Sequence, residues 1–369
     1  PTSSASASMT FLRCWRPMGS VMMTGRVDEI WIAVGPEMSR VMFLTAGTVV
    51  EIWHEFTAAP NCIGEVHQLK IDQLFGGQNR ATARLENGTP VSLRVTPRDK
   101  VQAGQSITAT IIAAPRQGKP WQAAIGARLV GTYVVLLPGD AGFYASRALP
   151  DDQVEPLRDS LAKKLPRGFG AILRRAVAGQ EASLVEDELT MLVHLWQDRV
   201  QATGCIHDGG TLSQKAALHA PGAAIRMTGD ALPADGFEAA YDAALDAASG
   251  ASVDLASGGR LWFEPTQALV AIDLDSGGGG FEALLREAPP MIAYQLRLRA
   301  LSGLITIDVP RLSSGAAKTF TTALAAAFAT DPRQPEILGR TRGGVMECRI
   351  AHGRPSLDSQ RHFADCITG

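Results

Sequence analysis

The sequence predicts an α+β protein built from several domains, and three observations support this prediction. At 369 residues the chain is longer than one hydrophobic core usually organises, so two to four domains are expected. Short strand patterns separated by turns fill the part before residue 129, which is typical of small antiparallel sheets. After residue 253, two apolar strand patterns flank a helical pattern, which is typical of a crossover between parallel strands.

The overall composition excludes several classes of protein. Apolar residues make up 46% and charged residues 20% of the chain, which excludes a disordered or fibrous protein. The 35 basic and 37 acidic residues give a net charge of −2, so any binding of nucleic acid must come from local basic patches. No apolar run reaches the roughly 20 residues that span a bilayer. We therefore expect a soluble, cytoplasmic protein without a membrane partner.

The cysteines are scattered and form no C-x-x-C pair of the kind that marks a zinc ribbon or a redox motif. We expect reduced thiols, and we do not expect zinc as a cofactor. The five cysteines are Cys14, Cys62, Cys205, Cys348 and Cys366.

Residues 1–25 show neither helical nor strand periodicity, and they lack the continuous apolar segment of a signal peptide. We expect this stretch to be an upstream extension, with Met22 or Met23 as the native start.

Three strand patterns after residue 26 predict a β-meander. They run from Ile30 to Val34, from Val41 to Leu44 and from Val49 to Trp53, with short turns between them.

A second group of strand patterns covers residues 63–129. Asn87 and Gly88 lie between two of these patterns, and this pair is the strongest short-range signal for a hairpin. Residues 107–111 alternate between apolar side chains and Thr, as a half-buried strand does. Several short strands at this spacing predict a small closed barrel of the OB type, which binds single-stranded nucleic acid on one face. A barrel without a role in RNA binding fits this pattern equally well.

Residues 130–203 predict short strands and a long amphipathic helix. The strand patterns cover Tyr133–Leu137 and Gly170–Arg174, and the helical pattern follows them with apolar residues at steps of three and four. The apolar positions are Val185, Leu189, Leu192, Trp196 and Val200. In residues 204–252 we predict only a helix over Phe237–Ala248.

Two aspartates end the strand patterns of the last third of the chain. The runs Leu269–Asp273 and Leu304–Asp308 flank a helix, which we expect to have Pro289 and Pro290 near its start and Gly303 beyond its end. If these strands are parallel neighbours, both carboxylates emerge at one edge of the sheet. Ligands that are all oxygen select Mg²⁺ or Mn²⁺ over zinc, and such a site suits phosphodiester hydrolysis. Spacing alone leaves the alternative that the aspartates cap strand ends or turns.

Six stretches of sequence resemble motifs of the ribonuclease E/G family. The resemblance begins near residue 26 and is strongest from residue 258 onward. The stretches are IAVGPE (32–37), VEIW (50–53), GGRLWFEPTQALVAIDLDS (258–276), QLRLRALSGLITID (295–308), GRTRGGVME (339–347) and RPSL (354–357).

The resemblance implies an α+β multidomain fold in which a ribonuclease H-like subdomain is interrupted by an OB-fold barrel and a 5′-sensor, and a deoxyribonuclease I-like α/β catalytic domain follows. The implied limits are residues 26–62 with 204–252 for the ribonuclease H-like subdomain, 63–129 for the RNA-binding barrel, 130–203 for the 5′-sensor, 253–357 for the catalytic domain and 358–369 for a vestigial zinc-link tail.

The resemblance also implies an activity. The family cleaves single-stranded RNA in RNA processing or decay and leaves a 5′ phosphate and a 3′ hydroxyl, with Mg²⁺ as the cofactor. Asp273 and Asp308 match the two aspartates that hold the metal. The alternative is a catalytically weak RNA-binding relative that keeps the fold.

Two further groups of residues follow from the resemblance. Gly131, Val135, Arg174 and Arg175 are the candidates for binding the 5′ phosphate of the RNA, and an arginine fork suits a phosphate well. Without the motif, Arg174 would be a solvated residue at the end of a strand. Lys119 and Arg342 are additional RNA-binding candidates.

The sequence departs from the family pattern at four places. The family has Asn where Asp275 stands, so Asp275 either becomes a third catalytic carboxylate or disturbs the site. Arg175 replaces the sensor threonine. The base-stacking aromatics of the barrel fall near residues 82–83 and 90–91, which are not aromatic here. The C-P-x-C zinc link is replaced by a tail with the single Cys366, so we expect at most a homodimer and no zinc-linked tetramer.

Overall fold

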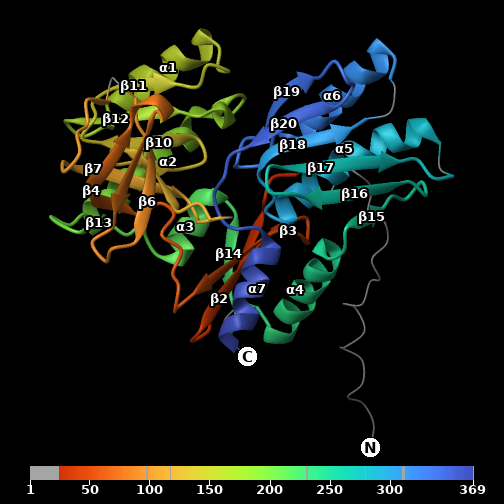
Figure 1. Cartoon of the computed structure of the whole chain (residues 1–369), viewed down its shortest axis with the longest axis horizontal. Coiled ribbons are helices and arrows are strands. Elements are labelled where there is room, and N and C mark those ends of the chain that lie inside the picture. The colour runs from red at the N-terminus through yellow and green to blue at the C-terminus, as the bar shows by residue number, and fades with distance from the viewer. Residues whose placement is uncertain are drawn as a thin grey trace, which may run out of the picture.

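The computed structural model describes residues 25–368 except 97–98, 117, 230–231, 279 and 310–311, and it describes side chains up to Ala364. The extension before residue 25, with Cys14, and the side chain of Cys366 therefore lie outside the described residues. The described part is a mixed α/β structure with four β-sheets, as the strand and helix patterns predict. In Figure 1 the barrel and the small sheet of residues 129–173 lie to the left, and the sheet that carries Asp273 lies to the right.

The first sheet has the strand order β14-β1-β2-β3. Its first three strands form the expected antiparallel meander, and β14 joins β1 in parallel although about 190 residues separate them. Helices α3, α4 and α5 pack against this sheet. The elements are β1 (Glu29–Ala33), β2 (Met38–Thr45), β3 (Thr48–Phe56), α3 (Leu212–His219), β14 (Ala224–Met227) and α4 (Ala234–Ala248).

Five strands close into an OB-like barrel. Their order is β4-β5-β6-β8-β7, and β7 pairs back with β4, so no strand edge of the barrel remains open. The expected hairpin is the pair β5–β6, with Gly88 at φ +85° in its turn. The strands are β4 (Val66–Phe75), β5 (Arg80–Arg84), β6 (Pro90–Arg94), β7 (Ser106–Ala113) and β8 (Trp121–Ile125), with the short helix η1 (Gly76–Gln78) after β4.

A four-stranded sheet and two helices follow the barrel. The sheet order is β11-β12-β10-β9, and the predicted amphipathic helix packs on it with Val185, Leu189 and Leu192 fully buried. Val200 lies just beyond the helix on extended backbone and is exposed. The elements are β9 (Leu129–Val130), β10 (Val134–Pro138), β11 (Phe143–Ala145), α1 (Asp151–Ala162), β12 (Phe169–Leu173), η3 (Arg175–Val177) and α2 (Ala182–Arg199).

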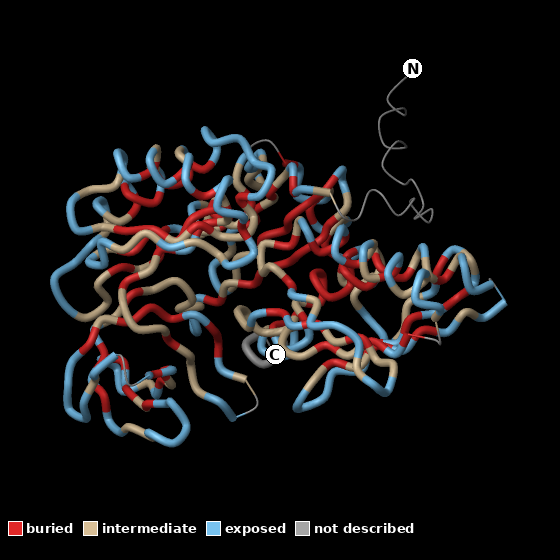
Figure 2. Tube along the Cα trace, turned by 90° about the horizontal axis from the view of Figure 1, so that it is seen from above, coloured by how far each residue is buried: buried red, intermediate tan, exposed pale blue. Residues whose placement is uncertain are grey.

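The last sheet has six strands in the order β15-β16-β17-β18-β20-β19, and β17 and β18 are parallel neighbours. Helices α5 and α6 bury one face of it, and the other face is open to solvent. Figure 2 shows the buried stretches running along the sheets and the exposed ones on the outer helix turns and loops. The elements are β15 (Ser252–Asp254), β16 (Arg260–Pro265), β17 (Leu269–Asp275), α5 (Phe281–Leu298), β18 (Gly303–Asp308), α6 (Ser314–Phe328), β19 (Glu336–Arg340), β20 (Met346–Ile350) and α7 (Leu357–Thr368).

The start of the crossover helix differs from the prediction. Helix α5 begins at Phe281, so Pro289 and Pro290 lie in its middle and not near its start. Proline removes backbone hydrogen bonds inside a helix. Here a fully buried stripe at steps of four residues runs through the proline pair and holds both halves against the sheet. The stripe consists of Leu284, Ala288, Ile292 and Leu296.

Strand β13 (Cys205–His207), which follows α2, pairs with β4 of the barrel.

Across the described residues, none of the helices combines the length and the apolar character needed to cross a bilayer.

Candidate functional site

The two aspartates singled out by the sequence lie side by side. Strands β17 and β18 pair in parallel with Asp273 opposite Asp308, so both side chains project from the same face at the carboxyl ends of the strands. Neighbouring strands lie about 4.8 Å apart, which brings the two carboxylates within reach of one ion. Both residues are exposed, and within the described residues no hydrogen bond or ion pair engages either carboxylate. Their oxygens are free to act as ligands.

Alternation along the strands decides which side chains share the face with the aspartates. Ile272 and Ile307 point the other way and are buried under α5 and α6. On the open face, Trp262 of β16 lies directly opposite Asp273, and its side chain is 36% exposed. Glu347 of β20 lies opposite Thr306, one pleat before Asp308. The open face therefore combines an acidic centre with an aromatic ring beside it.

The donor set at this centre suits a hard divalent cation. Two like charges a few Å apart repel each other unless a proton or a cation lies between them. Asp273 and Asp308 offer carboxylate oxygen, and Glu347 adds a third carboxylate on the same face. Oxygen ligands and an open coordination sphere favour Mg²⁺ or Mn²⁺. The residues present therefore fit the metal that the resemblance implies.

Asp275 lies on the same face, two residues beyond Asp273, but the structure gives it another partner. Its Oδ1 atom accepts a hydrogen bond of 2.9 Å from the backbone N–H of Gly277. Gly277 has φ +51°, and an added Cβ would lie 2.3 Å from the carbonyl oxygen of Gly258, so this turn requires glycine. The geometry favours Asp275 as a residue that shapes the turn after β17.

Asp275→Asn, which restores the residue of the family, is expected to keep or raise activity. Asparagine also accepts the Gly277 hydrogen bond through its side-chain oxygen, and it removes one negative charge beside Asp273. The rate of RNA cleavage at limiting Mg²⁺ measures the effect. A rate well below that of the parent would instead identify Asp275 as a metal ligand.

The two additional RNA-binding candidates lie far apart. Arg342 is exposed in the turn between β19 and β20, next to the strand ends that carry Asp308. Lys119 is exposed in the connection between barrel strands β7 and β8 and lines a different feature, a cavity of about 600 Å³. The structure thus brings Arg342, but not Lys119, to the end of the sheet where the aspartates lie.

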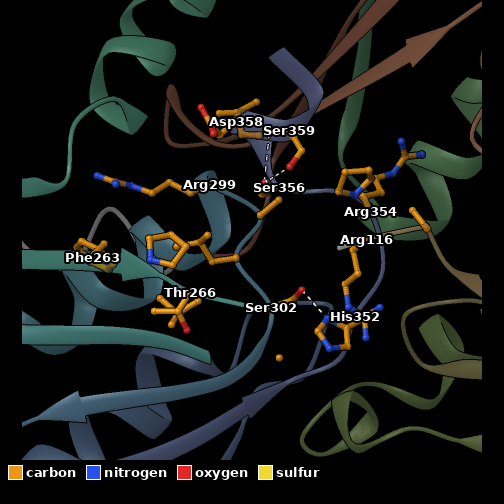
Figure 3. Close-up of a pocket in the computed structure, with 18 of the residues that line it drawn as sticks. Arg116, Phe263, Thr266, Arg299, Ser302, His352, Arg354, Ser356, Asp358 and Ser359 are labelled. Carbon is orange, nitrogen blue, oxygen red and sulfur yellow. Dashed lines mark hydrogen bonds between the residues drawn. The ribbon is translucent and has the colours of Figure 1, made fainter. Parts of the chain in front are cut away.

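The 600 Å³ cavity lies between the barrel and the opposite end of the last sheet. It is lined by the first residues of β17 and β18, so about four residues, or roughly 13 Å, separate it from the aspartates. Figure 3 shows Arg116 and His352 on one wall, with His352 hydrogen-bonded to Ser302. Burial, Arg116 and Lys119 lower the pKa of His352 to about 4, so its ring is neutral at pH 7. The aspartate site itself is an open surface.

Arg174, the main candidate for the 5′ phosphate, is engaged with backbone carbonyls. Its Nη1 atom donates to Gly131 at 2.6 Å, and its Nη2 atom donates to Pro332 of the last domain at 3.0 Å. Arg175 donates to the carbonyl of Pro335 at 2.9 Å. Both arginines therefore join the region of residues 130–203 to the loop between α6 and β19.

A residue that the sequence did not single out occupies the centre of this region. The carboxylate of Glu188 accepts hydrogen bonds of 2.7–2.8 Å from the backbone N–H groups of Thr132, Tyr133 and Val134. Burial raises the pKa of Glu188, although these three bonds favour its charged form. An added Cβ at Gly131 would lie 2.5 Å from the same carboxylate. Val135 is buried in β10. The amide cluster beside Arg174 is thus occupied by an internal carboxyl group.

The barrel carries a basic patch on its outer surface. Arg80 lies opposite Arg94, and Arg84 lies opposite Lys70, and all four side chains are exposed. Of the residues near the expected aromatic positions, Ala83 and Val91 point into the barrel, and Thr82 and Pro90 lie on its outer face. The alternation in RATAR (80–84) was the available sequence signal, because it places both arginines on the face opposite the buried alanines.

Several residues in the stretches that resemble family motifs hold parts of the fold together. Arg297 of QLRLR donates to the buried carboxylate of Glu51 at 3.0 Å, and His219 lies 2.9 Å from the same carboxylate. Arg354 of RPSL pairs with Glu55 at 2.6 Å and lies over the ring of Trp53. These contacts join the first sheet to α5 and to the segment before α7.

Comparison with known proteins identifies the family. Residues 128–230 and 236–349 match the family model described as the Ribonuclease E/G family. This chain belongs to the ribonuclease E/G family. The matched residues include both strands that carry the paired aspartates, so the family assignment covers the candidate site.

Individual relatives within the ribonuclease E/G family are distant. Ribonuclease E of Escherichia coli (strain K12) is 26% identical over 314 residues, which is 72% of this chain and 29% of that protein. Ribonuclease E of Haemophilus influenzae is 26% identical over 339 residues, 79% of this chain and 34% of that protein. Ribonuclease G of Escherichia coli (strain K12) is 22% identical over 344 residues, 76% of this chain and 70% of that protein. The chain thus spans about a third of the length of the Ribonuclease E relatives.

Proposed function

We propose that this chain is a Mg²⁺-dependent endoribonuclease that cleaves single-stranded RNA in RNA processing or decay and leaves a 5′ phosphate and a 3′ hydroxyl. The observation that carries the proposal is the pairing of Asp273 with Asp308, two exposed carboxylates at the ends of parallel strands that have no hydrogen-bond or ion-pair partner among the described residues. Membership of the ribonuclease E/G family supports it. We assign the first sheet with β14 to the ribonuclease H-like subdomain and the last sheet to the deoxyribonuclease I-like catalytic domain.

In this proposal Asp273 and Asp308 hold Mg²⁺, which Mn²⁺ could replace. Held by these two carboxylates, such an ion would lower the pKa of a water molecule and offset negative charge on a phosphodiester oxygen. Trp262, beside Asp273, offers a ring on which an RNA base can stack, worth roughly 1–3 kcal/mol. Arg342 is placed to contact a phosphate near the cleaved bond.

The barrel provides the second RNA contact in this proposal. Its basic patch of Lys70, Arg80, Arg84 and Arg94 contains one carboxylate, Asp72, which pairs with Arg84 at 3.1 Å. Four cations against one anion leave a local positive surface on a chain whose net charge is −2. Contacts with the phosphate backbone give affinity without base preference and weaken as salt increases. The charged patch takes the place of the aromatic platform expected of the barrel, so RNA binding should depend strongly on ionic strength.

The alternative is a catalytically weak RNA-binding relative, and Asp275 in place of asparagine is the observation that favours it. The unpartnered state of Asp273 and Asp308 argues for the enzyme, because carboxylates kept only for structure usually cap a turn, as Asp275 does.

The deciding experiment incubates the purified chain with a 5′-monophosphorylated single-stranded RNA in Mg²⁺ and, in parallel, in EDTA. We expect internal cleavage with Mg²⁺ and none with EDTA. The downstream product, which carries the new 5′ end, should be degraded by a 5′-phosphate-dependent exonuclease. A fully paired duplex of the same sequence serves as the control and should remain intact. Binding of the RNA without cleavage in Mg²⁺ or Mn²⁺ would establish the RNA-binding alternative.

The 5′-sensor role of Arg174 stays a prediction with a selective test. Arg174→Ala is expected to slow cleavage of 5′-monophosphorylated RNA and to leave the rate on 5′-hydroxyl RNA unchanged, because only the former offers the terminal phosphate. Arg167→Ala removes an exposed arginine of the same region and should change neither rate. If Arg174→Ala slows both substrates equally, Arg174 serves only to join the Gly131 and Pro332 segments.

A further inference from the structure

A second group of metal-binding side chains lies where the barrel meets β13, away from the aspartates. The ligand atoms of Glu65, His67 and Cys205 all lie within 4.8 Å of one another. The Nε2 atom of His67 is 2.7 Å from the Oε2 atom of Glu65, and Cys205 lies directly opposite His67 in the pairing of β13 with β4. All three side chains are partly buried. A carboxylate, an imidazole and a thiol therefore already converge on one point.

A fourth side chain of suitable chemistry lies next to this cluster. Cys62 lies in the turn just before Glu65, and its Sγ atom donates to the carbonyl oxygen of Pro60 at 3.6 Å. The backbone N–H of Glu65 donates to the carbonyl of Cys62 at 3.0 Å, so a tight turn presents both residues together. Neither cysteine is in a disulfide. The two strands thus bring one thiol, one imidazole and one carboxylate together, and the turn places a second thiol next to them.

We propose that Glu65, His67 and Cys205 bind a zinc ion and that Cys62, turning its thiol away from Pro60, completes a tetrahedral site. Zinc takes four ligands from Cys, His and carboxylate side chains in structural sites. Thiolate ligands distinguish this site from the all-oxygen site of Asp273 and Asp308, which suits Mg²⁺. On binding, each thiol loses its proton to water and the ring nitrogen that faces the ion gives up any proton it holds.

The charges around the cluster are compatible with such an ion. Two thiolates and one carboxylate carry three negative charges, and Zn²⁺ leaves a net charge of −1. Lys215 interacts with Cys62 and supplies one positive charge beside the site. In the described part of the chain, the cluster therefore has a neighbouring cation that balances the loaded site.

The position of the cluster gives the ion a structural role. Cys62, Glu65 and His67 lie where the chain enters the barrel, and Cys205 lies where it returns after α2. Strands β4 and β13 pair at this point, with Cys205 opposite His67 (Figure 1). The barrel and the region of residues 130–203 thus form an insertion whose two ends the zinc ion would tie together. This role is independent of the proposed cleavage reaction.

Zinc binding at this cluster is contrary to the expectation that the chain binds no zinc. That expectation rested on the absence of C-x-x-C pairs in the sequence. Cys205 is separated from Cys62 by more than 140 residues, so no spacing rule could have joined them.

The test uses the full chain purified under reducing conditions. We expect one zinc ion per chain by elemental analysis after gel filtration. Replacement with Co²⁺ is expected to give visible d–d bands of tetrahedral cobalt and a near-ultraviolet thiolate-to-cobalt charge-transfer band. Cys205→Ala and His67→Ala should lose the zinc and these bands. Cys62→Ala should lose about half of the charge-transfer intensity, because one of the two thiolates is removed.

Matched controls separate ligation from general damage. Cys348→Ala removes a buried cysteine of the last sheet, and His194→Ala removes an exposed histidine of α2. Both should bind zinc and cobalt as the parent does. Removal of zinc with phenanthroline, which leaves Mg²⁺ in place, should increase proteolysis within the exposed segment 200–203.

Two results would overturn the proposal. The first is a parent protein with no more zinc than the Cys205→Ala protein. The second is a cobalt complex without a thiolate charge-transfer band. A Cys62→Ala protein with the full band would remove Cys62 from the site.

Discussion

Asp308→Asn and Asp273→Asn are each expected to abolish RNA cleavage while leaving RNA binding and folding intact. Loss of a residue that only supports a metal ligand typically costs about 10–100-fold, so loss of a ligand should cost more than about 100-fold. Both residues are exposed, and in the part of the chain that the structure describes neither has a partner, so the substitution should change the free energy of unfolding by no more than about 0.5 kcal/mol. Without metal, each variant should be slightly more stable than the parent, because one of two neighbouring like charges is removed.

Glu264→Gln is the matched control for these variants. Glu264 is an exposed carboxylate on the same face of the last sheet, but it lies opposite Ala271, one pleat away from Asp273. The Glu264→Gln substitution removes the same charge without removing a proposed ligand, so the rate of RNA cleavage should stay close to that of the parent. RNA affinity is measured by fluorescence anisotropy in EDTA, and cleavage by gel electrophoresis in Mg²⁺. Parental cleavage rates in both aspartate variants would refute the catalytic assignment.

Glu51→Gln is expected to destabilise the fold by about 3–5 kcal/mol, the usual cost of removing one partner from a buried ion pair. Glu51 is 6% exposed and accepts hydrogen bonds from Arg297 at 3.0 Å and from Trp53 at 2.8 Å. Glutamine keeps the volume but leaves the guanidinium of Arg297 without its counter-charge. Urea unfolding at pH 7 measures the loss. Glu37→Gln, at an exposed site after β1, should be close to neutral.

The contribution of Glu51 should also depend on pH. Burial alone would raise the pKa of Glu51, but His219 and Arg297 hold it well below the ordinary value of 4.5. A lowered pKa in the folded state means that the stabilisation is complete above the pKa of the unfolded chain and is lost as the pH falls through the folded value. The difference in unfolding free energy between the parent and Glu51→Gln should therefore be constant near neutral pH and shrink in acid. A difference that is the same at pH 7 and pH 3 would contradict this.

The sequence predicted the parts of the fold that local patterns determine. The β-meander, the barrel hairpin at Gly88 and the crossover that pairs Asp273 with Asp308 all follow from strand periodicity and turn residues. The predicted start of α5 was wrong, because prolines usually lie in the first turn of a helix, whereas the apolar stripe that starts at Leu284 extends this helix through the proline pair. Packing against a sheet can offset the hydrogen bonds that prolines remove.

Contacts between residues far apart in the chain could not be predicted from local sequence patterns. Glu51 reads as a polar residue in a strand, and only the fold shows that Arg297, almost 250 residues later, pairs with it. Glu188 lies on the buried face of α2, where its carboxylate accepts hydrogen bonds from the backbone N–H groups of residues 132–134. Helical periodicity alone does not reveal those donors. Cys205 and His67 become neighbours only through the pairing of β13 with β4.

The first sheet packs against elements that come from much later in the chain, and this sets an order for folding during synthesis. Strand β1 requires β14, about 190 residues later, and β3 packs against α5 and α7. The N–H of His54 donates to Gln360 at 3.0 Å, and Phe56 contacts Phe363. The barrel, in contrast, closes entirely within residues 66–125. On the ribosome, contiguous units fold as they emerge, so the barrel can close while β1–β3 still lack their partners. The residues of the first sheet are made early, yet their core is completed only after α7 has been translated.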